Sequence, residues 1–82
     1  MPTILRGAVL RAGAPASGAY VRVLDGGGEF TGEQRTGDDG RFRFNLSPGR
    51  WSVVAFAAGG ERTVQEVTLA DGEDRTLDVG LG

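Results

Sequence analysis

Two residue types that commonly carry enzyme chemistry are missing from this sequence, which has no cysteine and no histidine. Without cysteine the chain has no disulfide and no thiolate metal site, and this absence fits a reducing compartment. Without histidine it lacks the usual general base near neutral pH and the commonest metal ligand. An enzyme is therefore the least favoured class of function, and we expect no cofactor and no metal.

Charge and hydropathy argue against two further kinds of partner. The net charge is −2, whereas a protein that binds nucleic acid needs a basic face. No apolar run approaches the ~18–20 residues that cross a membrane. Arg6 and Arg11 interrupt the apolar start of the chain, which alternates as a strand does and not as a signal peptide. We therefore expect a cytoplasmic protein that binds neither nucleic acid nor membrane.

A hairpin in the middle of the chain gives the clearest structural signal. Residues 41–46 begin by alternating arginine with phenylalanine, which is the period-two pattern of a strand with one buried face. The turn signals Asp-Gly at 39–40 and Pro-Gly at 48–49 lie on either side of this strand. Residues 50–58 are apolar on both faces, so we predict a second strand in the centre of a sheet.

Five further segments are predicted as strands because apolar and polar residues alternate between Gly, Asp and Pro turns: 3–11, 19–25, 30–36, 61–69 and 74–81. Gly7, in the middle of the first, suggests a bulge or a close approach of another backbone. No segment has helical periodicity. The 82 residues are therefore predicted to form one all-β domain over 1–82, a seven-stranded antiparallel Greek-key β-sandwich.

Four residues are candidates for an interaction surface. Tyr20 and Phe30 lie outside the main inward-facing stripes or near loops, so they are expected to be available for contact. Arg41 and Arg43 share the exposed face of their strand. That face is either a solvated, salt-bridged sheet surface or a patch for an anion or a protein partner.

Other conspicuous residues have simpler explanations than a ligand site. Trp51 alternates with Val53 and Ala55 on an inward stripe, so we expect it in the core and not as a sugar-stacking platform. Acidic residues fall at predicted turns, without the spacing of a known Ca²⁺ loop: Asp38, Asp39, Asp71, Glu73 and Asp74. The glycine run at 26–28 lacks the lysine and helix of a P-loop. Ser17 and Ser47 have no activating base.

The turn and strand motifs resemble the carboxypeptidase-regulatory-like, prealbumin-type (transthyretin-like) sandwich superfamily. The matching runs are Gly7-Ala8-Val9, Gly18-Ala19-Tyr20-Val21, Asp39-Gly40 with Phe42 and Phe44, and Pro48-Gly49 with Trp51. The resemblance implies a prealbumin-like fold. Transthyretin-like hydrolases and intradiol dioxygenases also resemble this fold, but both depend on histidine residues that the chain lacks.

A closer resemblance is to a small uncharacterised family of actinobacterial proteins. It rests on the runs GAYVRVLD, EFTGE, GRFRF and PGRW. Members are commonly encoded beside a thiosulfate sulfurtransferase (rhodanese), and the resemblance implies an accessory role in sulfur metabolism.

These observations favour a non-catalytic domain that acts through protein contact, with a sulfurtransferase or a second copy of itself as partner. The alternative is a carbohydrate- or surface-binding module from a longer exported protein. An enzyme would need a pocket with converging polar groups.

Overall fold

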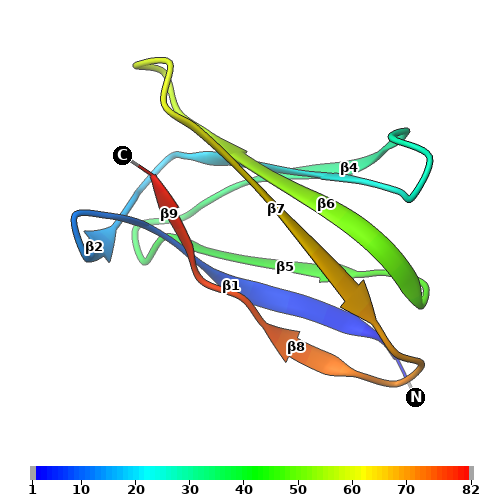
Figure 1. Cartoon of the computed structure of the whole chain (residues 1–82). Helices are drawn as coiled ribbons and strands as arrows, with labels where there is room; N and C mark the ends of the chain where they lie inside the picture. Colours follow the sequence, from blue (N-terminus) through cyan, green and yellow to red (C-terminus); the bar gives the residue numbers. More distant parts are fainter. Residues whose placement is uncertain (1, 82) are drawn as a thin grey trace.

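The computed structural model describes residues 2–81, and the elements that it contains there are strands and turns (Figure 1). Nine strands follow one another along this part of the chain: β1 (Ile4–Arg11), β2 (Ala14–Pro15), β3 (Tyr20–Leu24), β4 (Phe30–Arg35), β5 (Arg41–Asn45), β6 (Gly49–Phe56), β7 (Arg62–Leu69), β8 (Asp74–Thr76) and β9 (Val79–Leu81). Within the described residues, no helix is long and apolar enough to span a membrane.

The strands form two layers that face each other (Figure 1). One sheet has the order β4-β3-β6-β7 and is antiparallel throughout. In the other, β1 pairs antiparallel with β5 and β2 and parallel with β8 and β9. The predicted all-β sandwich is confirmed, but the sheet that contains β1 is mixed and not purely antiparallel.

The last predicted strand, 74–81, is in fact the two short strands β8 and β9. The interruption lies beside Gly7, where the backbone of Leu77 crosses the inner surface of β1. A Cβ atom built on Gly7 would lie 1.7 Å from the carbonyl oxygen of Leu77. Leu77 donates its N–H to the Arg6 carbonyl, and the Asp78 carboxylate accepts the N–H of Ala8. The close backbone approach predicted at Gly7 is therefore present, and it divides the C-terminal strand.

The core lies between the two sheets and is built from the inward residues of the alternating patterns. Phe42 and Phe44 are both buried, with ring centroids 6.1 Å apart. Trp51 is only 6% exposed, and its Nε1 donates to the carbonyl of Ser47 at 2.9 Å. Trp51 is therefore a core residue, as predicted from its alternation.

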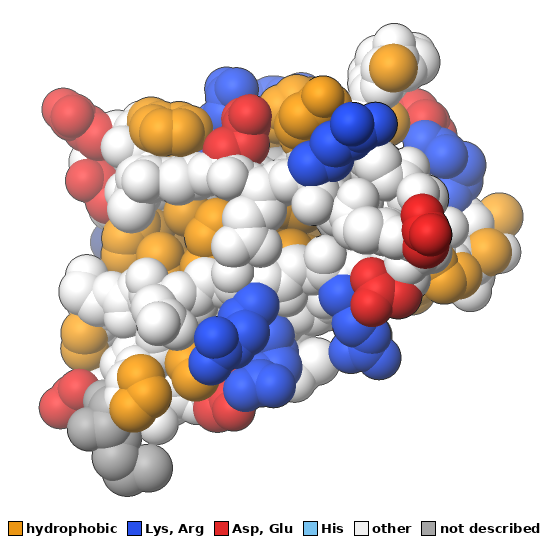
Figure 2. All heavy atoms as spheres, turned by 180° about the vertical axis from the view of Figure 1, so that it is seen from behind, with side chains coloured by type: hydrophobic (Ala, Val, Ile, Leu, Met, Phe, Trp, Pro, Cys, Tyr) orange, Lys and Arg blue, Asp and Glu red, His pale blue; other side chains and the backbone are white. Residues whose placement is uncertain are grey.

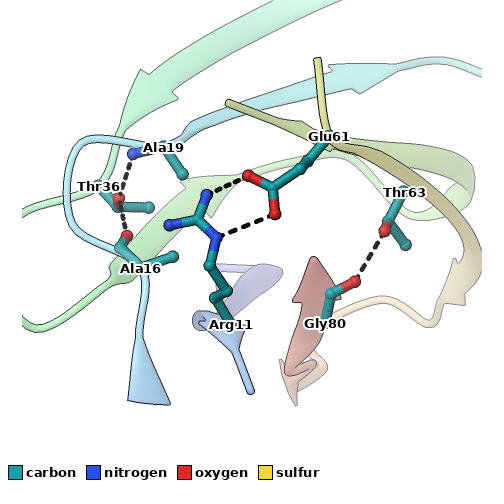
Figure 3. A network of polar contacts seen from close by, with 7 residues as sticks. All are labelled: Arg11, Ala16, Ala19, Thr36, Glu61, Thr63 and Gly80. Carbon is teal, nitrogen blue, oxygen red and sulfur yellow. Dashed lines mark hydrogen bonds and ion pairs between the residues drawn. The ribbon is translucent and has the colours of Figure 1, made fainter. Parts of the chain in front are cut away.

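Polar contacts join the elements around the rim of the sandwich (Figure 3). The buried Thr36 hydroxyl donates to the Ala16 carbonyl at 2.7 Å and accepts the Ala19 N–H at 2.9 Å. Arg11 of β1 donates two hydrogen bonds to Glu61, which lies in the turn between β6 and β7 of the other sheet. Because these contacts satisfy backbone groups or pair opposite charges, they fix the loops between strands as well as the strands themselves.

On this rim, Thr63 of β7 donates from its hydroxyl to the carbonyl of Gly80 in β9 at 2.7 Å. At the other rim, the amide of Gln34 in β4 reaches the backbone of β5. Its oxygen accepts the N–H of Arg43 at 3.0 Å, and its nitrogen donates to the carbonyl of the same residue. One side chain thus occupies the N–H and carbonyl that Arg43 presents on the side of β5 away from β1.

Candidate functional site

The outer surface of the four-stranded sheet carries most of the exposed aromatic side chains. Alternation along β3 turns Tyr20 and Arg22 outward, and the register places them beside Phe56 and Val54 of β6. Phe30 of β4 and Val64 of β7 extend the same surface. We call the surface the aromatic face, and it consists of these members: Tyr20, Arg22, Leu24, Phe30, Val54, Phe56 and Val64.

Three of these side chains are unusually exposed for their size: Tyr20 by 36%, Val64 by 49% and Phe30 by 61%. Val54 beneath them is only 4% exposed. Apolar side chains of this size gather in the core of most small domains, so an exposed group of them on one sheet indicates a contact surface.

Arginine side chains lie across the rings of the aromatic face. The guanidinium carbon of Arg22 is 5.2 Å from the centroid of Phe56 and 5.7 Å from that of Phe30. Tyr20 stacks on Phe56 with centroids 5.3 Å apart, and Arg35 lies 5.9 Å from the Tyr20 ring. These distances are within the range of cation–π attraction.

Glu33 holds Arg22 in this position. Arg22 Nε donates to Glu33 Oε1 at 2.9 Å, and the two residues face each other in the β3–β4 register. Because the rings and an ion pair already restrain the guanidinium, Arg22 would lose little side-chain entropy when a partner binds it.

A depression of about 340 Å³ adjoins the aromatic face near the β6–β7 turn. Its lining includes apolar side chains, among them Leu24, Val54 and Phe56, and three charged ones, which are Arg22, Glu61 and Arg62. The volume is at the low end for small-ligand sites, and the lining combines apolar carbon with a few charged groups, which is typical of a recognition surface.

The four candidate residues from the sequence fall on two different surfaces. Tyr20 and Phe30 both belong to the aromatic face. Arg41 and Arg43 lie on β5, on the outer side of the other sheet, where they line a separate hollow with Arg6. Seen from behind, basic side chains lie both in the lower half of the molecule and along its upper rim, where they neighbour hydrophobic side chains (Figure 2).

Two of the three arginines that line this hollow, Arg6 and Arg41, lie beside a carboxylate. Arg6 makes a bidentate pair with Asp74, at 2.8 and 2.7 Å, and Arg41 lies 3.9 Å from Asp39. Such a partly neutralised surface suits the solvated, salt-bridged interpretation better than an anion site.

Phe56 and Arg22 were not among the candidates from the sequence. Residues 50–58 are apolar at nearly every position, so alternation alone could not distinguish the outward Phe56 from its inward neighbours. Arg22 was expected to face water, and it does, but its place between two rings depends on the strand register. The missing information was which residues of β3, β4 and β6 lie side by side.

Two of the acidic residues considered as Ca²⁺ ligands, Asp39 and Glu73, contribute to turns, whereas Asp74 begins β8 and pairs with Arg6. Asp39 accepts the N–H of Arg41 at 3.0 Å, and Glu73 accepts that of Ala70 at 2.8 Å. Across residues 2–81 there is no group of three or more His, Cys, Asp or Glu side chains placed to hold a metal ion.

Two glutamates with lowered pKa values, Glu61 and Glu73, make the free energy of unfolding decrease at acid pH. Arg11 lowers the pKa of Glu61 by hydrogen bonding, and the Ala70 N–H, with help from Arg75, lowers the pKa of Glu73. A carboxylate with a lowered folded-state pKa stabilises the protein above its unfolded pKa of about 4.3, and that contribution is lost as the pH falls through the folded value.

We therefore expect the free energy of unfolding to fall as the pH drops below about 4.3. Urea titrations at a series of pH values should show a shallower acid decline for Glu73→Gln than for the original chain. The double variant Glu61→Gln/Glu73→Gln should be shallower still. Parallel declines in all three proteins would contradict the assignment.

The sequence and the fold are both similar to those of known proteins. Residues 1–80 match the family described as protein of unknown function (DUF1416). An uncharacterized protein of Mycolicibacterium smegmatis (strain ATCC 700084 / mc(2)155) is 41% identical over 63 residues, covering 76% of this chain and 70% of that protein. Two uncharacterized proteins of Mycobacterium tuberculosis (strain ATCC 25618 / H37Rv), Rv0814c and Rv3118, are each 41% identical over 59 residues. The match covers 71% of this chain and 59% of each of them, less than two thirds of their length.

Two solved structures share the fold. The dioxygenase domain of a dioxygenase carbohydrate-binding protein fusion from Streptomyces sp. SirexAA-E has a TM-score of 0.73 at 21% identity, covering 98% of this chain and 79% of that one. BcpA*(D312A), the major pilin subunit of Bacillus cereus, has a TM-score of 0.69 at 12% identity, covering 94% and 28%. At these identities the likeness concerns the fold alone. By its sequence match over residues 1–80, the chain belongs to the DUF1416 family, whose function is unknown.

Proposed function

We propose that this chain is a non-catalytic accessory domain that binds another protein through the aromatic face. The observation that carries the proposal is the grouping of Tyr20, Phe30 and Phe56 with a restrained Arg22 on one exposed sheet surface. Tyrosine and arginine are enriched among the residues that dominate binding energy at protein interfaces, and a rigid sheet presents them with little ordering on contact.

A thiosulfate sulfurtransferase is our candidate partner. The support is the resemblance of the GAYVRVLD, EFTGE, GRFRF and PGRW runs to actinobacterial proteins encoded beside such an enzyme. On this proposal the domain works in sulfur metabolism in the cytoplasm, and its sandwich is of the prealbumin-like type. Its role would be to position or regulate the enzyme, since it contributes no histidine or cysteine of its own.

The test is calorimetric titration of the chain into a thiosulfate sulfurtransferase from the same organism. Phe30→Ala should weaken binding by about 30-fold or more if Phe30 is a dominant contact. Its melting temperature should hardly change, because the side chain is 61% exposed. Arg43→Ala, on the opposite sheet, is the matched control and should bind as the original chain does.

The possible results separate the two parts of the proposal. Absence of binding to the enzyme would reject the sulfurtransferase as partner. Binding that Phe30→Ala and Tyr20→Ala leave unchanged would reject the aromatic face.

A carbohydrate- or surface-binding module is the second candidate, favoured by exposed rings beside a 340 Å³ depression. The contacts within the face weigh against it. Tyr20 is already stacked on Phe56, and Arg22 lies over Phe30. Sugar-binding rings usually need a free surface for stacking. Glycan-array binding that is lost in Phe30→Ala would favour this candidate over the first.

A further inference from the structure

No strand pairs with the outer edge of β4 in the described part of the chain. β4 is the first strand of the four-stranded sheet, and this edge is its side away from β3. On the corresponding side of β5 the amide of Gln34 occupies the N–H and carbonyl of Arg43, and β7 is tied to β9 through Thr63. An uncovered edge can accept another strand through its backbone groups.

The β3–β4 register identifies which backbone groups point to this edge. Thr36 donates its N–H to Ala19, and hydrogen-bonded pairs alternate along an antiparallel ladder. Gln34, two residues before Thr36, is therefore also bonded to β3. The intervening Glu33 and Arg35 turn their N–H and carbonyl groups outward, away from β3.

The side chains of the same two residues have opposite charge. Within one chain Glu33 bonds Arg22 and Arg35 lies over the Tyr20 ring, so both charges stand on the outer surface of the sheet, where a paired strand would meet them. In an antiparallel pair of β4 strands related by a two-fold axis at Gln34, Glu33 of each copy lies opposite Arg35 of the other. We propose that β4 pairs in this way with β4 of a second copy of the chain. Two cross-strand ion pairs and four backbone hydrogen bonds would then form around the axis.

The charges also disfavour neighbouring registers. An axis at Glu33 sets two glutamates opposite each other, and an axis at Arg35 sets two arginines opposite each other. Both arrangements are repulsive. An axis at Gly32 leaves Glu33 opposite Thr31, without an ion pair. The axis at Gln34 is therefore the register among these four that pairs Glu33 with Arg35.

The contact is small, so the dimer is expected to be weak and dependent on concentration. One short strand on each side buries less area than the standard interface of about 800 Å² per partner. The second strand joins in the plane of the sheet, so the aromatic face stays open. Glu33 also bonds Arg22 and Arg35 lies over Tyr20, so the two proposals are separated by Phe30→Ala, which should weaken partner binding while leaving both β4 charges and the dimer in place.

Charge reversal gives a sharp test by sedimentation velocity from about 10 μM to about 1 mM, a range suited to weak association. The original chain should dimerise with rising concentration. Arg35→Glu and Glu33→Arg should each weaken self-association about tenfold or more, because each sets like charges opposite one another.

An equal mixture of the two variants should regain the dimer. One copy then has an acidic side chain at both positions and the other has a basic side chain at both, so opposite charges face each other across the axis. Glu66→Arg, on β7 of the same sheet, is the control and should associate as the original chain does.

A second measurement needs no variant. Amide hydrogen exchange of the original chain should slow at Glu33 and Arg35 as the concentration rises. A monomer at every concentration, single variants that dimerise normally, or exchange that does not slow would each overturn the proposal.

Discussion

Gly7→Ala should lower the free energy of unfolding by about 4 kcal/mol or more, among the largest effects that a single methyl group can have. The added Cβ would lie 1.7 Å from the carbonyl oxygen and 2.6 Å from the carbonyl carbon of Leu77. Both are backbone atoms, so no rotamer change can relieve the contact. The segment between β8 and β9 would have to leave β1, which breaks the Leu77–Arg6 and Asp78–Ala8 hydrogen bonds.

Thermal unfolding followed by circular dichroism measures this effect, and a drop of at least about 15 °C is expected for a domain of this size. Gly80→Ala is the matched control. Gly80 also lies in a strand, but nothing approaches within 4 Å of the position that its Cβ would take. If the two alanine variants melted within a few degrees of each other, the close approach at Gly7 would be wrong.

Trp51→Ala should cost about 3–5 kcal/mol, the usual range for removing a large buried aromatic side chain. Trp51 is 6% exposed and packs in the same cluster as Phe42 and Phe44. Its removal leaves a cavity in a domain too small to refill it, and it also leaves the Ser47 carbonyl without the indole N–H. Urea unfolding should be followed by circular dichroism and not by tryptophan fluorescence, because the substitution removes the one tryptophan in the sequence.

Trp51→Phe separates the two parts of that loss. It keeps most of the packing and removes the hydrogen bond to Ser47, so the expected cost is smaller, about 1–2 kcal/mol. A Trp51→Ala variant as stable as the original chain would show that this side chain is not part of the core.

The sequence was sufficient to predict β1 and β3 to β7, because alternation and turn chemistry are local, but the two-residue strand β2 was not predicted. Phe42 and Phe44 alternate with arginine, and both are buried in the structure. The turn signal at Asp39-Gly40 is matched by a φ of 72° at Gly40. These features depend on neighbours along the chain, which the sequence displays directly.

The direction and partner of the C-terminal strand could not be predicted in the same way. Leu77, Val79 and Leu81 alternate as if in one strand, yet the segment is divided and runs parallel to β1. Its path is determined by contacts with Gly7, close to the other end of the chain. A glycine in mid-strand indicated a close approach at Gly7 but could not identify Leu77 as the residue that makes it.

The candidate site was predictable only in part, for a related reason. Tyr20 and Phe30 were identified because they fall outside the inward stripes. Their grouping with Phe56 and Arg22 depends on the pairing of β3 with β4 and β6, which is a long-range property. Arg41 and Arg43 were recognised as a pair, but the opposite sheet that carries them separates them from the aromatic residues.

The side chain of Gln34 has a consequence for the behaviour of the protein in concentrated solution. Its carboxamide bonds the Arg43 N–H and carbonyl as a neighbouring peptide unit would, and so hinders edge-to-edge pairing of β5 with a foreign strand at this position. Gln34→Ala removes both hydrogen bonds to Arg43 and frees this part of the β5 edge, so the variant is expected to melt somewhat lower and to precipitate faster on storage. Resistance to aggregation thus depends on a polar group at the edge of the sandwich, whereas most of the free energy of unfolding comes from the side chains in its core.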